Sequence, residues 1–254
     1  MKFITWIILF PFLACASYAV DIKKEGLIPS YNPTELNLLF FLPYDPTIIL
    51  IGDRLSDVSL ILAKQVECAN VYGFTTDAAD FETLSRLGKQ RPNLRAHFGL
   101  LNDLRDGSQL FYSTLPHDIP NENYYHFSGS CLKPTDARRP FLFGPSYKVP
   151  TFNFSKFCKS HEIRKIHFIQ MDCGGNELNT LKSIQEYLKE AIVVNLKTYH
   201  QEIRQGISPF RHIHKLMTSL GYELFSHYIY DNVIGDACYV KSKYITAVFR
   251  SKEI

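Results

Sequence analysis

The sequence predicts an α/β domain built on a mainly parallel sheet, with an antiparallel hairpin at one edge. From residue 47 onward, short apolar runs alternate with segments that have the apolar spacing of a helix. Short links join them, which favours a parallel sheet with helices on both faces. The last two apolar runs follow each other without a helix between them, and therefore predict the antiparallel pair.

The expected elements form two groups with an irregular segment between them. The first group is strand 47–52, helix 56–65, strand 68–74, helix 80–87 and strand 94–101. The second is strand 148–154, a helical turn at 155–160, strand 163–172, helix 177–189, strand 191–198, helix 209–220, and strands 222–230 and 236–242. Between the groups, residues 102–148 are rich in Gly, Pro, Asn and Asp. They predict an irregular insertion, either a long loop or a small subdomain, of the kind that often binds ligands.

The N-terminus predicts a secretory signal peptide. A basic residue precedes the apolar run FITWIILFPFLACASYAV, and Ser17-Tyr18-Ala19 fits a small-x-small cleavage site. The alternative is an uncleaved membrane anchor, for which the run is short and is interrupted by Pro11. We therefore expect a signal peptide at 1–19, a proline-rich lead-in at 20–46 and one domain at 47–254. The protein is then secreted or extracytoplasmic, and anchored in a membrane only if the signal segment is not cleaved.

Charge and cysteine content argue against two classes of partner. The net charge of +3 is small, and no basic stripe is interleaved with aromatic residues, so a nucleic-acid partner is not expected. The six cysteines are far apart, none forms a C-x-x-C pair, and a structural zinc site is not expected either.

Ligands of such sheets bind at the carboxyl ends of the strands, so residues that follow the strands are candidate site residues. Gly52 and Asp53 follow the first strand, where glycine would let the backbone approach a ligand, or would form an ordinary turn. Thr75 and Asp77 follow the second strand and either meet a ribose or belong to a polar turn. Asp172 either orients a bound cation or accepts a hydroxyl proton, or instead accepts backbone N–H bonds near the next helix.

Two further polar residues stand out near these strand ends. Lys197 lies inside a buried-looking strand, where lysine is seldom found without a partner. It either reaches the candidate site or extends to the surface. Asn176 is most simply the N-cap of the helix that follows Asp172.

The segment HFIQMDCGGNELNTLKSI resembles the hallmark of the FkbM-type methyltransferases, an apolar strand followed by D-x-E-G-x-E and then L-K. Asp172, Gly175, Glu177, Leu181 and Lys182 fall in register with that pattern. TIILIGDRLSDVSLILAK is similar to the family's glycine-rich first motif, and NVYGFTTDAADFETL to its second strand and the loop that follows. The resemblance covers residues 47–241.

This resemblance implies a seven-strand Rossmann-like sheet, S-adenosylmethionine as cofactor, and methyl transfer to a hydroxyl of a saccharide, lipid or natural product. It also implies roles for the strand-end residues. Gly52 and Asp53 would flank the methionine end of the cofactor, Thr75 and Asp77 would meet its ribose, and Asn102 would lie on the adenine side. Asp172 would orient the acceptor or act as its base.

Several positions depart from the family pattern. Leu50, Thr75 and Gly174 stand where the family has acids, Ser56 stands where it has a glycine, and Lys197 stands where it has a strand glutamate. These departures leave a second hypothesis open, a secreted non-catalytic binding protein on the same scaffold.

Overall fold

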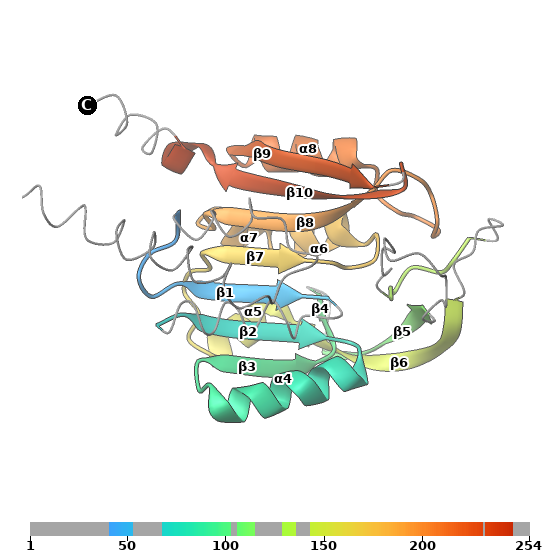
Figure 1. The fold of residues 1–254 in the computed structure, drawn as a ribbon, viewed down its shortest axis with the longest axis horizontal. Coiled ribbons are helices and arrows are strands. Elements are labelled where there is room, and N and C mark those ends of the chain that lie inside the picture. Colours follow the sequence, from blue (N-terminus) through green and yellow to red (C-terminus); the bar gives the residue numbers. More distant parts are fainter. Residues whose placement is uncertain are drawn as a thin grey trace, which may run out of the picture.

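The main sheet has seven strands in the order β3-β2-β1-β7-β8-β10-β9 (Figure 1). The computed structural model describes residues 41–52, 68–102, 106–114, 129–135, 143–230 and 232–245. The strands are β1 (Thr47–Ile51), β2 (Asn70–Thr75), β3 (Leu94–Phe98), β7 (Phe168–Met171), β8 (Val193–Tyr199), β9 (Tyr222–Tyr230) and β10 (Ile234–Lys241). The first five run parallel, and β10 is antiparallel to both β8 and β9. The predicted α/β class, seven-strand sheet and antiparallel edge hairpin are confirmed.

Helices cover both faces of this sheet (Figure 1). They are α4 (Ala78–Gln90), α5 (Phe154–Ser160), α6 (Glu177–Ser183), α7 (Gln185–Leu188) and α8 (Phe210–Ser219). Leu84 of α4 packs with Leu50 and Val71 in one apolar core, while residues of the other four helices pack on the opposite face. Within the described ranges, no helix is long and apolar enough to cross a membrane. The predicted signal peptide and the predicted helix at 56–65 lie outside the described residues.

The predicted strand at 94–101 is wrong, because the chain changes sheet at Gly99. Leu94–Phe98 belong to the main sheet, whereas β4 (Leu100–Asn102) pairs with β6 (Phe143–Asn153) in a second one. Gly99 has a φ of +141°, and a Cβ on it would lie 2.5 Å from the carbonyl oxygen of Pro150. Only glycine fits such a turn against neighbouring backbone, and this turn redirects the chain.

The expectation that residues 102–148 are irregular is wrong for part of the segment. β5 (Gly107–Thr114) and most of β6 lie in it, and they pair antiparallel. The second sheet has the order β4-β6-β5 and lies beyond the carboxyl ends of β1, β2 and β3 (Figure 1). Its alternating pattern buries Phe111 and Val149, but the Gly, Pro and Asn content of the segment obscures that signal in the sequence.

The predicted helix at 177–189 is interrupted at Ile184. α6 ends at Ser183, whose hydroxyl donates to the carbonyl oxygen of Thr180 at 2.7 Å, and α7 begins at Gln185. A serine that bonds back to the preceding turn competes with helix hydrogen bonding, which accounts for the break. Ile184 itself is fully buried.

Candidate functional site

Gly52 and Asp172 touch at the carboxyl ends of the neighbouring strands β1 and β7. The Asp172 N–H donates to the carbonyl oxygen of Ile51 at 2.8 Å. Gly52 has a φ of +139°, and a Cβ on it would lie 2.5 Å from the backbone oxygen of Asp172. The structure thus brings the predicted glycine and the predicted acid together, and it leaves no room for a side chain at 52. Asp53 lies outside the described residues.

The end of β2 carries Thr75 and Asp77, both already engaged within the chain. Thr75 is fully buried, and its hydroxyl oxygen accepts a hydrogen bond from the Asp77 N–H at 3.1 Å. The Asp77 carboxylate accepts from the Asp80 N–H at 2.7 Å and so caps α4. Asp77 is exposed, and a carboxylate has two oxygens that can accept, so it keeps capacity for a ribose hydroxyl. Of the two, Asp77 is the better placed to meet a ligand.

The second sheet closes over this strand end. The Tyr147 hydroxyl on β6 donates to the carbonyl oxygen of Thr76 at 3.1 Å, and the Gly99 N–H donates to that of Thr75 at 2.8 Å. Asn102, predicted on the adenine side, pairs through its backbone with Asn153 of β6. Its side chain lies outside what the structure describes, so only its place on β4 is known.

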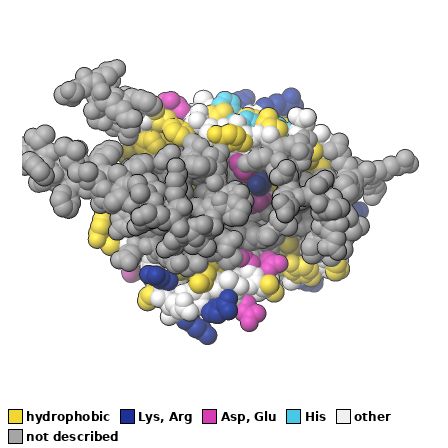
Figure 2. All heavy atoms as spheres, in the orientation of Figure 1, with side chains coloured by type: hydrophobic (Ala, Val, Ile, Leu, Met, Phe, Trp, Pro, Cys, Tyr) yellow, Lys and Arg dark blue, Asp and Glu magenta, His cyan; other side chains and the backbone are white. Residues whose placement is uncertain are grey.

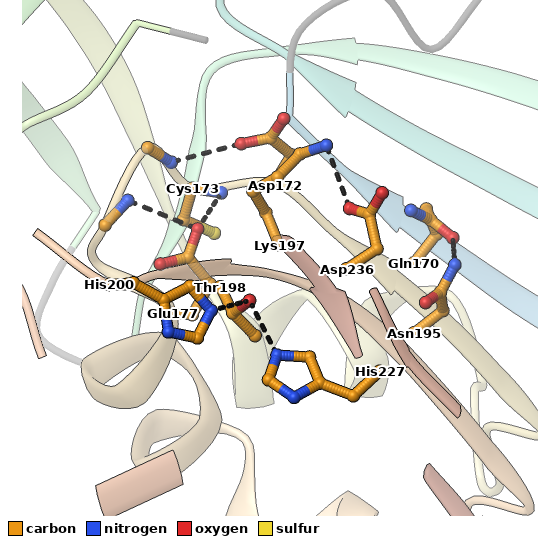
Figure 3. Close-up of polar contacts among 12 residues, drawn as sticks. Gln170, Asp172, Cys173, Glu177, Asn195, Lys197, Thr198, His200, His227 and Asp236 are labelled. Atoms are coloured by element: carbon orange, nitrogen blue, oxygen red, sulfur yellow. Dashed lines mark hydrogen bonds and ion pairs between the residues drawn. The ribbon is translucent and has the colours of Figure 1, made fainter. Parts of the chain in front are cut away.

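The loop after β7 is held by two carboxyl groups (Figure 3). Glu177 is buried, and its Oε1 accepts from the N–H groups of Cys173 at 2.8 Å and Gly175 at 3.2 Å. Asp172 Oδ1 accepts from the Gly174 N–H at 3.3 Å. Burial, reinforced by the nearby Asp172 charge, raises the pKa of the Glu177 carboxyl to about 8.

Asn176 is in the N-cap position of α6, but its side chain makes no capping hydrogen bond. Its Oδ1 instead accepts from the side-chain amide of Asn179 at 2.8 Å. The Glu177 side chain does not replace the cap, because it bonds to N–H groups of the loop that precedes the helix.

Arg204 and the segment 129–135 pack against the same loop, and the sequence pointed to neither. Arg204 is fully buried, and its Nη1 donates to the carbonyl oxygen of Gly174 at 2.8 Å. The Ser130 hydroxyl donates to the carbonyl oxygen of Cys173 at 3.3 Å. The Gln205 N–H donates to the carbonyl oxygen of Lys133 at 2.8 Å, so the segment also joins the chain beside Arg204. A buried arginine thus contacts Gly174, the position at which the family has an acid.

Lys197 is partly exposed and pairs with an acid on the neighbouring strand β10. Its Nζ lies 2.8 Å from Oδ1 of Asp236, and both side chains are about one-fifth exposed, at 22% and 23%. Met171 of β7 pairs with Leu196 of β8, so the next residues, Asp172 and Lys197, project from one face of adjacent strands. Figure 3 shows Lys197 extending toward Asp172 and Asp236. Acidic and basic side chains also gather near the middle of the face in Figure 2.

Residues 58–224 match the family described as the methyltransferase FkbM domain. The match spans more than half of the 254 residues, and includes β2, β7, β8 and the loop that holds Asp172. The chain belongs to the FkbM methyltransferase family. S-adenosylmethionine is the cofactor of this FkbM protein, as the resemblance in its sequence implied. No curated protein sequence matches it significantly.

Several solved structures resemble this FkbM protein at low sequence identity. A SAM-dependent methyltransferase from Aquifex aeolicus is 14% identical, with 88% of this chain and 98% of that one covered and a TM-score of 0.40. Precorrin-6y C5,15-methyltransferase from Geobacter metallireducens is 11% identical, with 85% and 91% covered and a TM-score of 0.43. Aeropyrum pernix fibrillarin with bound S-adenosylmethionine is 12% identical, with 79% and 68% covered and a TM-score of 0.41. These are distant resemblances, and the family assignment depends on the FkbM match.

The strand-end residues of the FkbM protein fit the cofactor. Gly52 lets the chain after β1 pack against the backbone of Asp172, and the lack of a side chain there would leave the strand end open to the methionine end of the cofactor. Asp77 offers an exposed carboxylate to ribose hydroxyls, whereas the buried Thr75 supports the Asp77 backbone instead. The donor set is therefore smaller than in the family pattern, but it includes a glycine and an acid at neighbouring strand ends.

Proposed function

We propose that this FkbM protein transfers a methyl group from S-adenosylmethionine to a hydroxyl oxygen of a saccharide, lipid or natural product. The observation that carries the proposal is the contact between Gly52 and Asp172 at adjacent strand ends. A small-molecule site in such a sheet lies where these ends meet. The family match supplies the reaction class, and the acceptor class comes from the resemblance alone.

We assign these residues the roles that the family resemblance implies. Gly52 and Asp53 would flank the methionine end of the cofactor, Asp77 would meet the ribose with Thr75 supporting its backbone, and Asn102 would lie on the adenine side. S-adenosylmethionine, when bound, supplies an electrophilic methyl group on its sulfonium. Asp172 accepts a hydrogen bond from the acceptor hydroxyl and so aims an oxygen lone pair at that methyl group. The methyl group would leave the sulfur for this oxygen, with S-adenosylhomocysteine as the other product, and Asp172 would receive the hydroxyl proton.

Transfer of labelled methyl groups tests this proposal. Purified protein without residues 1–19 would be incubated with S-adenosylmethionine labelled in its methyl group, and separately with pools of methyl glycosides, long-chain alcohols and phenols. We expect label in one pool, and at least a hundredfold less with Asp172→Ala, because general acid–base groups typically contribute that much. Cofactor binding by a folded protein with no transfer to any pool would contradict the proposal.

A second function is supported by the contacts at two positions that depart from the family pattern, Thr75 and Gly174. The Thr75 hydroxyl supports the Asp77 backbone, and Arg204 lies against Gly174, so both positions have structural contacts in place of acids. A secreted, non-catalytic binding protein on this scaffold would need no more than that. For this alternative, Asp172→Ala should leave its biological activity intact. Loss of that activity in a folded variant would count against it.

The proposed location is extracytoplasmic, with residues 1–19 removed as a signal peptide. Support comes from the basic start, the apolar run and the small residues that end it. Expression with the natural N-terminus in a secretory host, followed by N-terminal sequencing of protein from the medium, tests this. A start at residue 20 is expected. Protein that stays in the membrane fraction with Met1 intact would contradict cleavage.

A further inference from the structure

Five polar side chains lie together on one face of the sheet, beside Gly52. Strand register places Gln170 of β7 opposite Asn195 of β8, and Lys197 of β8 opposite Asp236 of β10. Asp172 follows the last paired residue of β7 and therefore lies on the other side of Lys197. Two polar rows therefore cross β7 and β8, one above the other. In a sheet covered on both faces, such positions are normally apolar, as Leu50 and Cys238 are in the lower of these rows. This group calls for a reason other than folding.

The lower row contains a buried acceptor to which no described residue donates a hydrogen bond. Asn195 is 2% exposed, and its Nδ2 donates to Oε1 of Gln170 at 2.8 Å. Its Oδ1 has no hydrogen-bond partner among the residues that the structure describes. A buried polar atom left unpaired is costly, and native proteins normally satisfy it with a water or a ligand. A ligand O–H group reaching this face would satisfy it.

The upper row carries charges that suit hydroxyl groups. The Lys197 ammonium donates hydrogen bonds, whereas the carboxylates of Asp172 and Asp236 accept them. A hydroxyl both donates and accepts, so adjacent hydroxyls of one molecule could bond to all three residues. An apolar alcohol could bond only once and would cover the other polar groups without adding hydrogen bonds to them.

The position of the rows relates them to the methyl acceptor. Gly52, the residue after β1, lies next to Asp172. The upper row continues from Asp172 through Lys197 to Asp236, away from β1. If the methionine end of the cofactor lies at Gly52, a molecule bound along this row has its nearest hydroxyl at Asp172. This step depends on the proposed function.

We propose that Asn195, Lys197 and Asp236 form an acceptor subsite for a polyhydroxylated molecule such as a saccharide. The subsite holds the hydroxyls that neighbour the methylated one, while Asp172 addresses the reacting hydroxyl. It excludes long-chain apolar alcohols as preferred acceptors.

Ligand-detected NMR with simple probes tests the subsite without knowledge of the natural acceptor. The probes are the methyl glycosides of galactose, mannose, fucose and xylose, with decanol as the apolar probe. The protein would be compared with Lys197→Met, Lys197→Arg and the double variant Lys197→Met/Asp236→Leu. The double variant keeps the fold testable, because it removes both charges and leaves neither one buried alone. Lys215→Met, at an exposed position on α8, is the matched control.

We expect at least one methyl glycoside to bind, with affinity reduced tenfold or more by Lys197→Met and by the double variant. A lost hydrogen bond to a charged group typically has that effect. Lys197→Arg should bind more tightly than Lys197→Met, and Lys215→Met should match the unchanged protein. Failure of every glycoside to bind, equal binding by the double variant, or preference for decanol would overturn the subsite. A separate titration with S-adenosylhomocysteine reports on the cofactor site, so failure of the proposed function is recognised independently.

Discussion

Arg204 donates from Nη1 to the carbonyl oxygen of Gly174 at 2.8 Å, across 30 positions of the chain. A Cβ on Gly174 would lie 2.9 Å from the same nitrogen and 2.3 Å from the backbone oxygen of Gly129. Packing at this position thus explains why the chain has glycine there and not an acid. Arg204 and residues 129–135 occupy the room that a side chain at 174 would need.

Gly174→Ala should therefore destabilise the protein by about 2–5 kcal/mol. Overpacking costs about 1–3 kcal/mol, and the left-handed backbone at Gly174, with a φ of +59°, adds about 1–2 kcal/mol for a residue with a Cβ. Gly206→Ala is the control, since Gly206 has a φ of +80° but no atom within 4 Å of an added Cβ. Urea unfolding of both variants measures the difference. Equal losses would mean that packing by Arg204 is unimportant.

Glu177→Gln should reduce the dependence of stability on pH. The folded-state pKa of Glu177 is about 8 and its ordinary value is 4.5, so the unfolded chain releases this proton first as the pH rises. The free energy of unfolding should then fall between pH 4.5 and 8, and the Glu177 carboxyl should contribute about a few kcal/mol to that fall. Glutamine can still accept the bonds from Cys173 and Gly175 but carries no charge. Urea unfolding at pH 5 and pH 8.5 should give a flatter profile for the variant, and parallel profiles would refute this account.

His97→Phe should protect the fold against acid. Burial, with help from His161 and Arg95, lowers the pKa of His97 from 6.5 to about 4. The unfolded chain therefore binds the proton first as the pH falls below 6.5, and stability falls by about 3 kcal/mol by pH 4. The ring lies 4.9 Å from those of both Phe74 and Phe157, so phenylalanine should fit. Thermal unfolding at pH 7 and pH 4 measures the effect, with the exposed His212→Phe as control. An unchanged acid response in His97→Phe would contradict the assignment.

Two substitutions of Asp77 should distinguish its role as the cap of α4 from its role toward the cofactor. Asp77→Ala removes the hydrogen bond from the Asp80 N–H and should cost about 1 kcal/mol of stability. Asp77→Asn keeps a capping oxygen but loses the charge, so stability should change little while S-adenosylhomocysteine binds tenfold or more weakly. Calorimetry and thermal unfolding on both variants distinguish the roles. Unchanged binding by Asp77→Asn would remove this residue from the ribose site.

The sequence was sufficient to predict the sheet and the edge at which Gly52 and Asp172 lie, whereas their contact depends on the pairing of β1 with β7. Apolar runs separated by helical segments imply parallel strands, and the carboxyl ends of such strands necessarily meet at one edge. The second sheet escaped prediction because turn-forming residues obscure the alternation in β5 and β6. The break at Gly99 depends on a contact with Pro150, 51 positions away, which a local pattern does not contain.

The polar partners within the site were beyond local patterns as well. Lys197 is unusual in the sequence, but its pairing with Asp236 depends on the antiparallel register of β8 and β10. Arg204 gave no signal at all, because its contact with Gly174 requires the loop after β8 to fold back on the loop after β7. A periodic pattern reports which face of an element is buried, whereas it cannot report which distant polar group lies there.

Calorimetric titration of S-adenosylmethionine into the protein without residues 1–19 tests the central claim most directly. The account predicts a saturable heat below millimolar ligand. It also predicts loss of that heat in Gly52→Val, whose added side chain would meet the backbone of Asp172. Absence of heat from the folded, unaltered protein at millimolar ligand, or unchanged binding by folded Gly52→Val, would contradict a cofactor site at Gly52 and Asp172.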